Sequence, residues 1–96
     1  MSRYVLSPRA RADLDEIWDY TTERWGGDQA EGYIRLLQRA IETVANDPRK
    51  GRSCDEVRAG YCKYPAGSHM LLYRSVKAGI DIVRILHSRM DFERHL

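Results

Sequence analysis

Five side chains able to take part in metal-free RNA cleavage lie in the last third of this 96-residue chain. They are His69, Tyr73, Arg74, Arg84 and His87. Such a reaction needs a base for the 2′-hydroxyl, an acid for the leaving oxygen and cations for the charge that develops on phosphorus. The sequence therefore allows a catalytic cluster, although histidines scattered through a small domain are more often structural or solvated.

Other chemistries find less support in the residues. No serine lies in a sequence typical of a strained nucleophile turn, and no histidine has a second ligand at metal spacing on the same element. Cys54 and Cys62 fit neither a zinc site nor a disulfide-rich secreted domain, so we interpret them as free thiols. We therefore expect no metal site and no cofactor.

Arg84 is unusual because it lies inside an apolar stretch. Strand alternation places Ile80, Ile82, Arg84 and Leu86 on one face and Asp81, Val83, Ile85 and His87 on the other. Both faces are mostly apolar, so the strand is expected in the middle of a sheet, covered on both sides. Two interpretations of Arg84 stay open: it pairs with a nearby carboxylate while its stem packs on the sheet, or it faces a ligand.

Composition indicates one soluble domain over residues 1–96, with 43% hydrophobic and 31% charged residues. The net charge of +2 is a mild excess, and it does not indicate a nucleic-acid-binding surface. One basic cluster contains Arg49, Lys50, Arg52, Arg58 and Lys63, and we interpret it as a solvated loop and strand edge. No apolar stretch approaches the roughly 20 residues that span a bilayer, so we expect a cytoplasmic protein with no membrane partner.

The first half of the chain predicts a strand followed by a helical hairpin. Tyr4–Leu6 is a short strand candidate, and Ser7 and Pro8 are typical of a helix start. The apolar stripe predicted for the first helix contains Leu14, Ile17, Trp18 and Trp25. After a break at 26–27, Asp28 and Glu31 predict a capping box for a second helix that ends before Pro48.

The second half predicts a solvated loop over residues 48–56 and then three strands, at 57–64, 69–75 and 80–87. Short turns between them indicate an antiparallel meander. The expected fold is therefore α+β: a strand, a helical hairpin on one sheet face, a three-stranded antiparallel meander and a short C-terminal tail, 90–96. The opposite sheet face is expected to be partly bare.

Several segments, taken in order, resemble the ParE branch of the RelE/ParE toxins. They are YVLSPRA at 4–10, DL at 13–14 with IWDY at 17–20, DPRKGR at 47–52, VRAGY at 57–61, HMLLYR at 69–74 and IVRILHSRMD at 82–91. The similarity extends over essentially the whole chain and implies a RelE/ParE-like fold. It also implies the toxin half of a type II toxin-antitoxin pair, neutralised by a ParD-like antitoxin encoded beside it. Operator DNA would be contacted only through the antitoxin.

The resemblance separates two mechanisms. The ParE branch is associated with inhibition of DNA gyrase, whereas RelE-type members cut messenger RNA on the ribosome with a cluster of Lys, Arg and a late Tyr or His. Arg84 matches that family's phosphate-facing arginine, but no tyrosine follows it, and Lys63 is the one strand lysine upstream. This favours a non-catalytic gyrase inhibitor. A ribosome-dependent endoribonuclease is the alternative, and a homologue that retains only antitoxin binding and operon co-repression is a third possibility.

Two sets of contact residues follow as expectations. The predicted target-binding residues are Arg84, His87, Arg89, Met90, Phe92 and Arg94. The antitoxin is expected to cover apolar residues that the chain leaves exposed, namely Leu71, Tyr73, Ile82 and Leu86, or alternatively the helical hairpin. Helix-in-groove docking and strand addition are both plausible modes.

Overall fold

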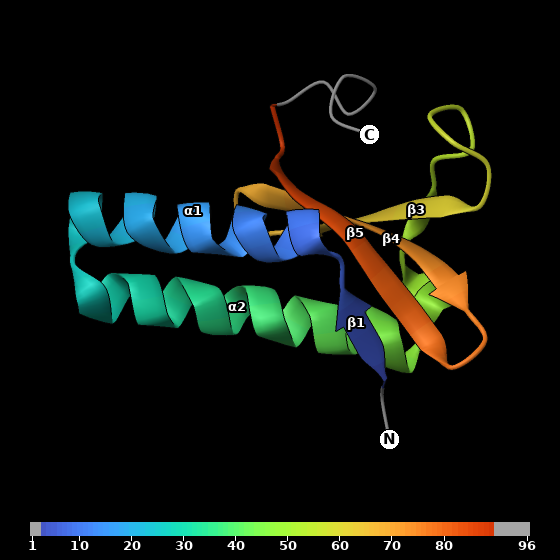
Figure 1. Ribbon diagram of the computed structural model, residues 1–96, viewed down its shortest axis with the longest axis horizontal. Helices are drawn as coiled ribbons and strands as arrows, with labels where there is room; N and C mark the ends of the chain where they lie inside the picture. The colour runs from blue at the N-terminus through green and yellow to red at the C-terminus, as the bar shows by residue number, and fades with distance from the viewer. Residues whose placement is uncertain (1–2, 90–96) are drawn as a thin grey trace.

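A helical hairpin packs against one face of a five-stranded sheet in the computed structural model, which describes residues 3–89 (Figure 1). The elements are β1 (Tyr4–Leu6), α1 (Pro8–Trp25), α2 (Gly27–Asn46), a 3₁₀ helix (Pro48–Lys50), β2 (Arg52–Ser53), β3 (Tyr61–Ala66), β4 (His69–Val76) and β5 (Gly79–His87). The strand order is β1-β5-β4-β3-β2, in which β1 runs parallel to β5 and the other neighbours are antiparallel. The α+β class and the meander are confirmed, and β2 is an additional short strand.

Within residues 3–89, neither helix has the length and apolar character needed to cross a membrane.

Ser7 joins the first strand to the first helix. Its backbone N–H donates to Ile82 O at 3.0 Å, and its Oγ donates to Val83 O at 2.7 Å. The same Oγ accepts from Ala10 N–H at 3.0 Å, which caps α1 as its sequence predicts. One residue therefore ends β1, starts α1 and holds both to β5.

A single glycine separates the two helices of the hairpin. Gly26 has φ +91°, and its N–H donates to Thr22 O at 2.9 Å while its carbonyl accepts from Ala30 N–H at 3.1 Å. It occupies the N-cap position of α2 without a side chain, so the capping box predicted at Asp28 is wrong. The reversal needs a positive φ, which glycine adopts without strain.

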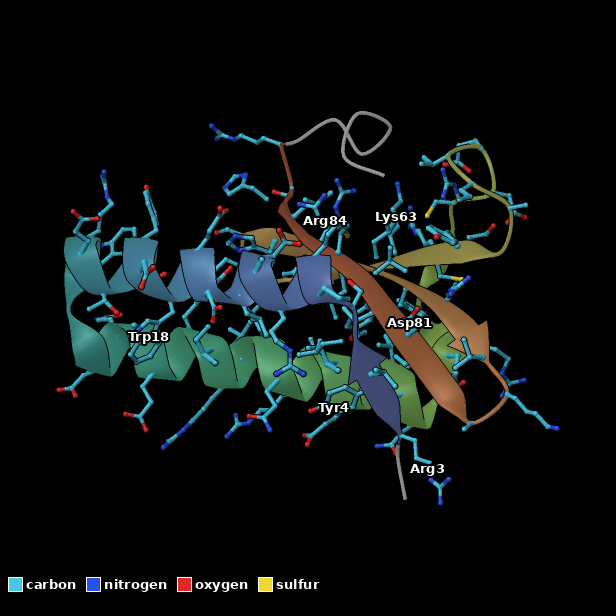
Figure 2. The ribbon with its side chains drawn as sticks, viewed as in Figure 1. Arg3, Tyr4, Trp18, Lys63, Asp81 and Arg84 are labelled. Atoms are coloured by element: carbon cyan, nitrogen blue, oxygen red, sulfur yellow. The ribbon has the colours of Figure 1, made fainter. Side chains whose placement is uncertain are left out.

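The buried stripe of α1 differs from the predicted one. Its buried residues are Ala10, Asp13, Ile17 and Thr21, whereas Trp25 is 57% exposed and Trp18 is also exposed. The tryptophans were therefore placed on the wrong face. Figure 2 shows Trp18 extending from α1 across the hairpin toward α2.

The sheet has apolar side chains on both faces. The main core lies between the hairpin and the sheet, and a second cluster of Cys54, Tyr61 and Leu72 lies with Val57 and Val83. Cys54 is fully buried, so the predicted solvated loop is wrong at this position, and β3 begins four residues later than predicted. The 54–61 segment folds over a face that was expected to be partly bare.

β5 lies between β1 and β4, which confirms its predicted position within the sheet. Ile82 pairs with Tyr73 and Arg84 pairs with Leu72, so Val83 is an extra residue on β5, a β-bulge. Beyond the bulge the predicted alternation is wrong. Ile85 consequently joins Ile80 and Ile82 in the main core.

The four residues predicted to be left exposed for an antitoxin are instead buried by the chain itself. Leu71, Tyr73 and Ile82 lie in the main core, and Leu86 is 2% exposed. The expectation of exposure is therefore wrong. The reason is that β4 and β5 are the strands over which the hairpin packs, so their apolar residues are covered within one molecule.

Candidate functional site

A groove of about 650 Å³ lies between α1, Tyr33 of α2, the β3–β4 turn and the end of β5. Its lining combines charged, imidazole and aromatic groups. These are Asp13, Glu16, Arg84, His69, His87, Tyr20, Trp25 and Tyr33, and Ile17, Thr21, Ser68, Ile85 and Leu86 complete the wall. The groove therefore contains several of the side chains that the sequence suggested for chemistry.

Arg84 forms a two-pronged ion pair with Asp13 at one side of the groove. Its Nε donates to Asp13 Oδ2 and its Nη2 donates to Oδ1, both at 2.8 Å, and the side chains are only 14% and 9% exposed. These hydrogen bonds to Asp13 raise the pKa of Arg84. The carboxylate-pairing interpretation of Arg84 is thus confirmed, while its predicted contact with a target stays a prediction.

Asp13 also completes the hydrogen bonding of β5. Its Oδ2 accepts from the backbone N–H of Ile85 at 2.9 Å. β1 ends at Leu6, opposite Ile82, so the ladder along this edge stops before Ile85. The carboxylate on α1 therefore replaces a strand at that point, which explains a buried acidic residue on the helix face that packs on the sheet.

Two histidines face each other across the strands at the other side of the groove. His69 and His87 are direct partners in the β4–β5 register, with ring centroids 5.4 Å apart in an edge-to-face arrangement. The Tyr33 hydroxyl lies 2.5 Å from His69 Nδ1 and accepts from Ser68 N–H at 2.9 Å. His87 Nδ1 accepts from the backbone N–H of Arg89 at 3.2 Å.

The environment of His69 favours its neutral form. Burial lowers its pKa below the usual 6.5, and the neighbouring His87 lowers it further, against a weaker opposing effect of Asp13. The turn that positions it contains Gly67 at φ +60°, where a Cβ would approach Tyr33 Cε1 to 2.7 Å. Glycine at this position therefore allows Tyr33 to reach both the turn and the imidazole.

Tyr73 and Arg74 lie away from the groove, although the sequence grouped them with the histidines. Tyr73 is fully buried, and its hydroxyl donates to Pro48 O at 2.6 Å and accepts from Gly51 N–H at 3.0 Å. Burial raises the pKa of Tyr73 to about 12. Arg74 pairs with Asp81 at 3.3 Å, and Figure 2 shows Asp81 well along β5 from Arg84. Three of the five catalytic candidates therefore converge.

Sequence reasoning missed two residues that shape this groove. Asp13 lies three residues after Ala10 and four before Ile17, so a charge within the buried helical spacing was the available signal. Tyr33 fits the apolar stripe of α2, and its hydrogen bonds could not be inferred from that position.

Three predicted target-binding residues, Met90, Phe92 and Arg94, lie outside the described residues. In residues 3–89, no group of three or more potential metal ligands is present.

Exposed aromatic side chains continue the groove along the hairpin. Tyr20 and Trp25 are exposed, with ring centroids 6.2 Å apart, and the Arg24 guanidinium lies 5.6 Å from the first ring centroid and 5.5 Å from the second. Trp18 and Leu36 add further exposed apolar surface on the same two helices. Exposed apolar groups that border a groove are typical of a protein-binding surface.

Comparison with known proteins gives consistent matches over nearly the whole chain. Residues 4–92 match the family model described as the ParE toxin of the type II toxin-antitoxin system, parDE. Toxin ParE1 of Mycobacterium tuberculosis is 60% identical over 96 residues, covering 99% of this chain and 98% of its own. Toxin ParE1 of Caulobacter vibrioides is 46% identical, covering 100% and 99%. Toxin ParE of Escherichia coli is 31% identical over 102 residues, covering 100% and 94%.

A solved structure described as the chromosomal ParDE TA system from P. aeruginosa has a chain with a similar fold. Its TM-score is 0.78 at 19% identity, with 91% of this chain and 96% of that chain covered. At this identity the match supports the RelE/ParE-like fold alone.

Proposed function

This chain belongs to the ParE toxin family of type II toxin-antitoxin systems, and from this premise we propose that a ParD-like antitoxin neutralises it and that its target is DNA gyrase. We propose that it inhibits gyrase in the cytoplasm without catalysing a reaction. Operator DNA is then contacted only through the antitoxin. The alternative remains ribosome-dependent cleavage of messenger RNA.

The charge of the groove is the observation that supports a non-catalytic mechanism. Arg84 would have to stabilise a phosphorane, but its charge is matched by Asp13 at 2.8 Å. A second carboxylate, Glu16, lines the same groove. Two acidic groups beside one paired arginine disfavour an RNA backbone, which proteins hold with uncompensated cations. Tyr73, the tyrosine on the neighbouring strand, lies in the core and cannot serve as an acid or base there.

The hairpin is the surface that we propose for the antitoxin. Because Leu71, Tyr73, Ile82 and Leu86 are buried, the exposed aromatic residues of α1 replace them in this role. An amphipathic antitoxin segment placed along Tyr20 and Trp25 would enter the groove between α1 and β5 by the helix-in-groove mode.

The predicted target-binding residues lie beside that proposed surface. Arg84 and His87 line the groove, and Arg89 follows at the exposed end of β5. An antitoxin bound there would cover them, so neutralisation by direct occlusion of the target-binding surface follows from the proposal.

The deciding experiment compares two purified reactions. The toxin, separated from its antitoxin, is added to a gyrase supercoiling and DNA-cleavage assay and, in parallel, to translating ribosomes with a defined message. We expect gyrase inhibition that the antitoxin reverses and an intact message. Message cleavage with unaffected gyrase would establish the ribonuclease alternative. Activity in neither assay, with tight antitoxin binding, would leave the co-repressor function.

Expression in cells also distinguishes gyrase inhibition from message cleavage. Expression without antitoxin is expected to cause filamentation and a DNA-damage response while messenger RNA stays intact. An Asp13→Asn, Arg84→Gln double variant is the matched test for the enzyme alternative, because it removes both charges together. If messages are cut by the wild type and spared by this variant while it still binds the antitoxin, the groove is a nuclease site.

A further inference from the structure

One hydrogen bond to His87 determines which ring nitrogen carries its proton. Its Nδ1 accepts from the backbone N–H of Arg89 at 3.2 Å. A backbone N–H is always a donor, so Nδ1 supplies a lone pair, and in the neutral ring the proton lies on Nε2. His87 therefore presents a donor at Nε2.

The same argument holds for His69 through Tyr33. The Tyr33 oxygen accepts from Ser68 N–H at 2.9 Å and lies 2.5 Å from His69 Nδ1. We assign the Tyr33 hydroxyl as the donor to His69 Nδ1, since the hydroxyl proton then has an acceptor. This arrangement satisfies all three groups at once and places the proton of neutral His69 on Nε2. Both rings line the groove, and no hydrogen bond to either Nε2 is present within residues 3–89.

On the basis of these two tautomers, and resting on the proposed antitoxin binding, we propose that His69 and His87 form a paired N–H donor site. It binds one Asp or Glu side chain of the antitoxin segment that occupies the groove. The ring centroids are 5.4 Å apart, so one carboxylate with two hydrogen bonds of about 2.8 Å can bridge donors on the two rings.

The surroundings disfavour a metal ion and a phosphate at this site. A metal ion needs a lone pair on Nε2, and in both tautomers that nitrogen carries a proton. A phosphate would bring close to two negative charges into a groove that already contains Asp13 and Glu16. The nearby aromatic wall of Tyr20 and Trp25 fits a peptide segment that carries one acidic group among apolar ones.

Asparagine and glutamine variants test the donor directly. A Gln amide nitrogen lies about where Nε2 lies, whereas an Asn amide reaches only to the Nδ1 position. Removing a hydrogen bond to a charged group weakens binding about 10- to 100-fold. We expect His87→Asn and His69→Asn each to raise the Kd for the antitoxin of the same operon by about this factor. His87→Gln and His69→Gln should stay within about threefold of the wild type.

Replacing each Asp and Glu of the antitoxin segment by its amide should identify one position whose effect disappears in the His87→Asn background. Equal weakening by Asn and Gln, or no weakening by either, would overturn the donor site. Glu16→Gln is the control, because it changes the groove's charge and leaves both imidazoles in place. The Kd of the Glu16→Gln variant should not rise as the Kd values of the two Asn variants do.

A second readout is histidine NMR, and its first part needs no antitoxin. In ¹⁵N-labelled toxin, histidine NMR should show the Nε2–H tautomer for both rings, and the two Nε2 protons should move downfield in the complex. An Nδ1–H tautomer for His87 would overturn the inference while leaving the proposed function intact. Failure of the wild-type toxin to bind its antitoxin would overturn both, and the titration distinguishes these results.

Discussion

The two sides of the groove show how similar polar side chains take different roles a few residues apart. At one side Asp13 and Arg84 use their charges on each other, and Asp13 also accepts from Ile85 N–H. At the other side His69 and His87 each use one ring nitrogen internally, and both residues line the groove. The first pair therefore holds α1 to β5, whereas the second pair is suited to recognition.

The largest effect is expected from breaking the ion pair. Asp13→Leu would remove the carboxylate that accepts from the largely buried Arg84 guanidinium and from the Ile85 N–H. We expect the free energy of unfolding to fall by about 3–5 kcal/mol, because removing one partner of a buried ion pair is costly. Urea unfolding measures this loss.

A double variant completes that test. Asp13→Leu with Arg84→Met removes both charges and should recover part of the stability lost by either single change. If Asp13→Leu alone costs less than about 1 kcal/mol, the pair is not structural and the contrast between the two sides of the groove fails.

Tyr73 is a second internally satisfied polar group, and its hydroxyl can be removed alone. Tyr73→Phe leaves Pro48 O without a donor and Gly51 N–H without an acceptor, so we expect a loss of about 1–3 kcal/mol. Tyr64→Phe is the matched control on β3, because its hydroxyl has no hydrogen bond within residues 3–89, and it should cost less than about 0.5 kcal/mol. Equal effects would show that the Tyr73 hydroxyl does not anchor the 48–51 segment.

His69 should make stability depend on pH. Its pKa is lowered in the folded state by burial, so the unfolded chain binds the proton more readily. Stability from this group is therefore present above about pH 6.5, the ordinary histidine value, and is lost as the pH falls toward the folded pKa. Urea unfolding at pH 7.5 and 5.5 should show a smaller pH dependence for His69→Gln than for the wild type. An unchanged dependence would mean that His69 titrates as it does in the unfolded chain.

The smallest effect is expected from an ion pair of the same chemistry on the surface. Arg35 and Glu31 lie one turn apart on α2, with side chains 67% and 56% exposed. Glu31→Gln should cost no more than about 0.5 kcal/mol, since exposed pairs gain little and salt screens them. A loss close to that of Asp13→Leu would refute burial as the origin of the difference.

Residues near one another in the chain were the ones that sequence reasoning placed well. The Ser7 cap, the break at 26–27, the helix end before Pro48 and the order of the last three strands were all predicted from local patterns. The two tryptophans were placed on the wrong face, because hydrophobic character alone does not tell which face of a helix meets the sheet. Cys54 was missed in the predicted solvated loop because it is buried by residues distant in the chain, such as Leu72 and Val83.

What the sequence determined by itself was the first strand, the two helices and the last three strands and, through its ordered motifs, the toxin family. Backbone preferences such as a cap, a positive φ or a proline act within a few residues, so they can be recognised without knowing the fold. Only the tertiary structure decided that Asp13 meets Arg84, 71 residues away, that the bulge at Val83 turns Ile85 into the core, and that His69 faces His87. These contacts depend on strand register and on how the hairpin packs, and packing is set by the whole molecule rather than by any local pattern.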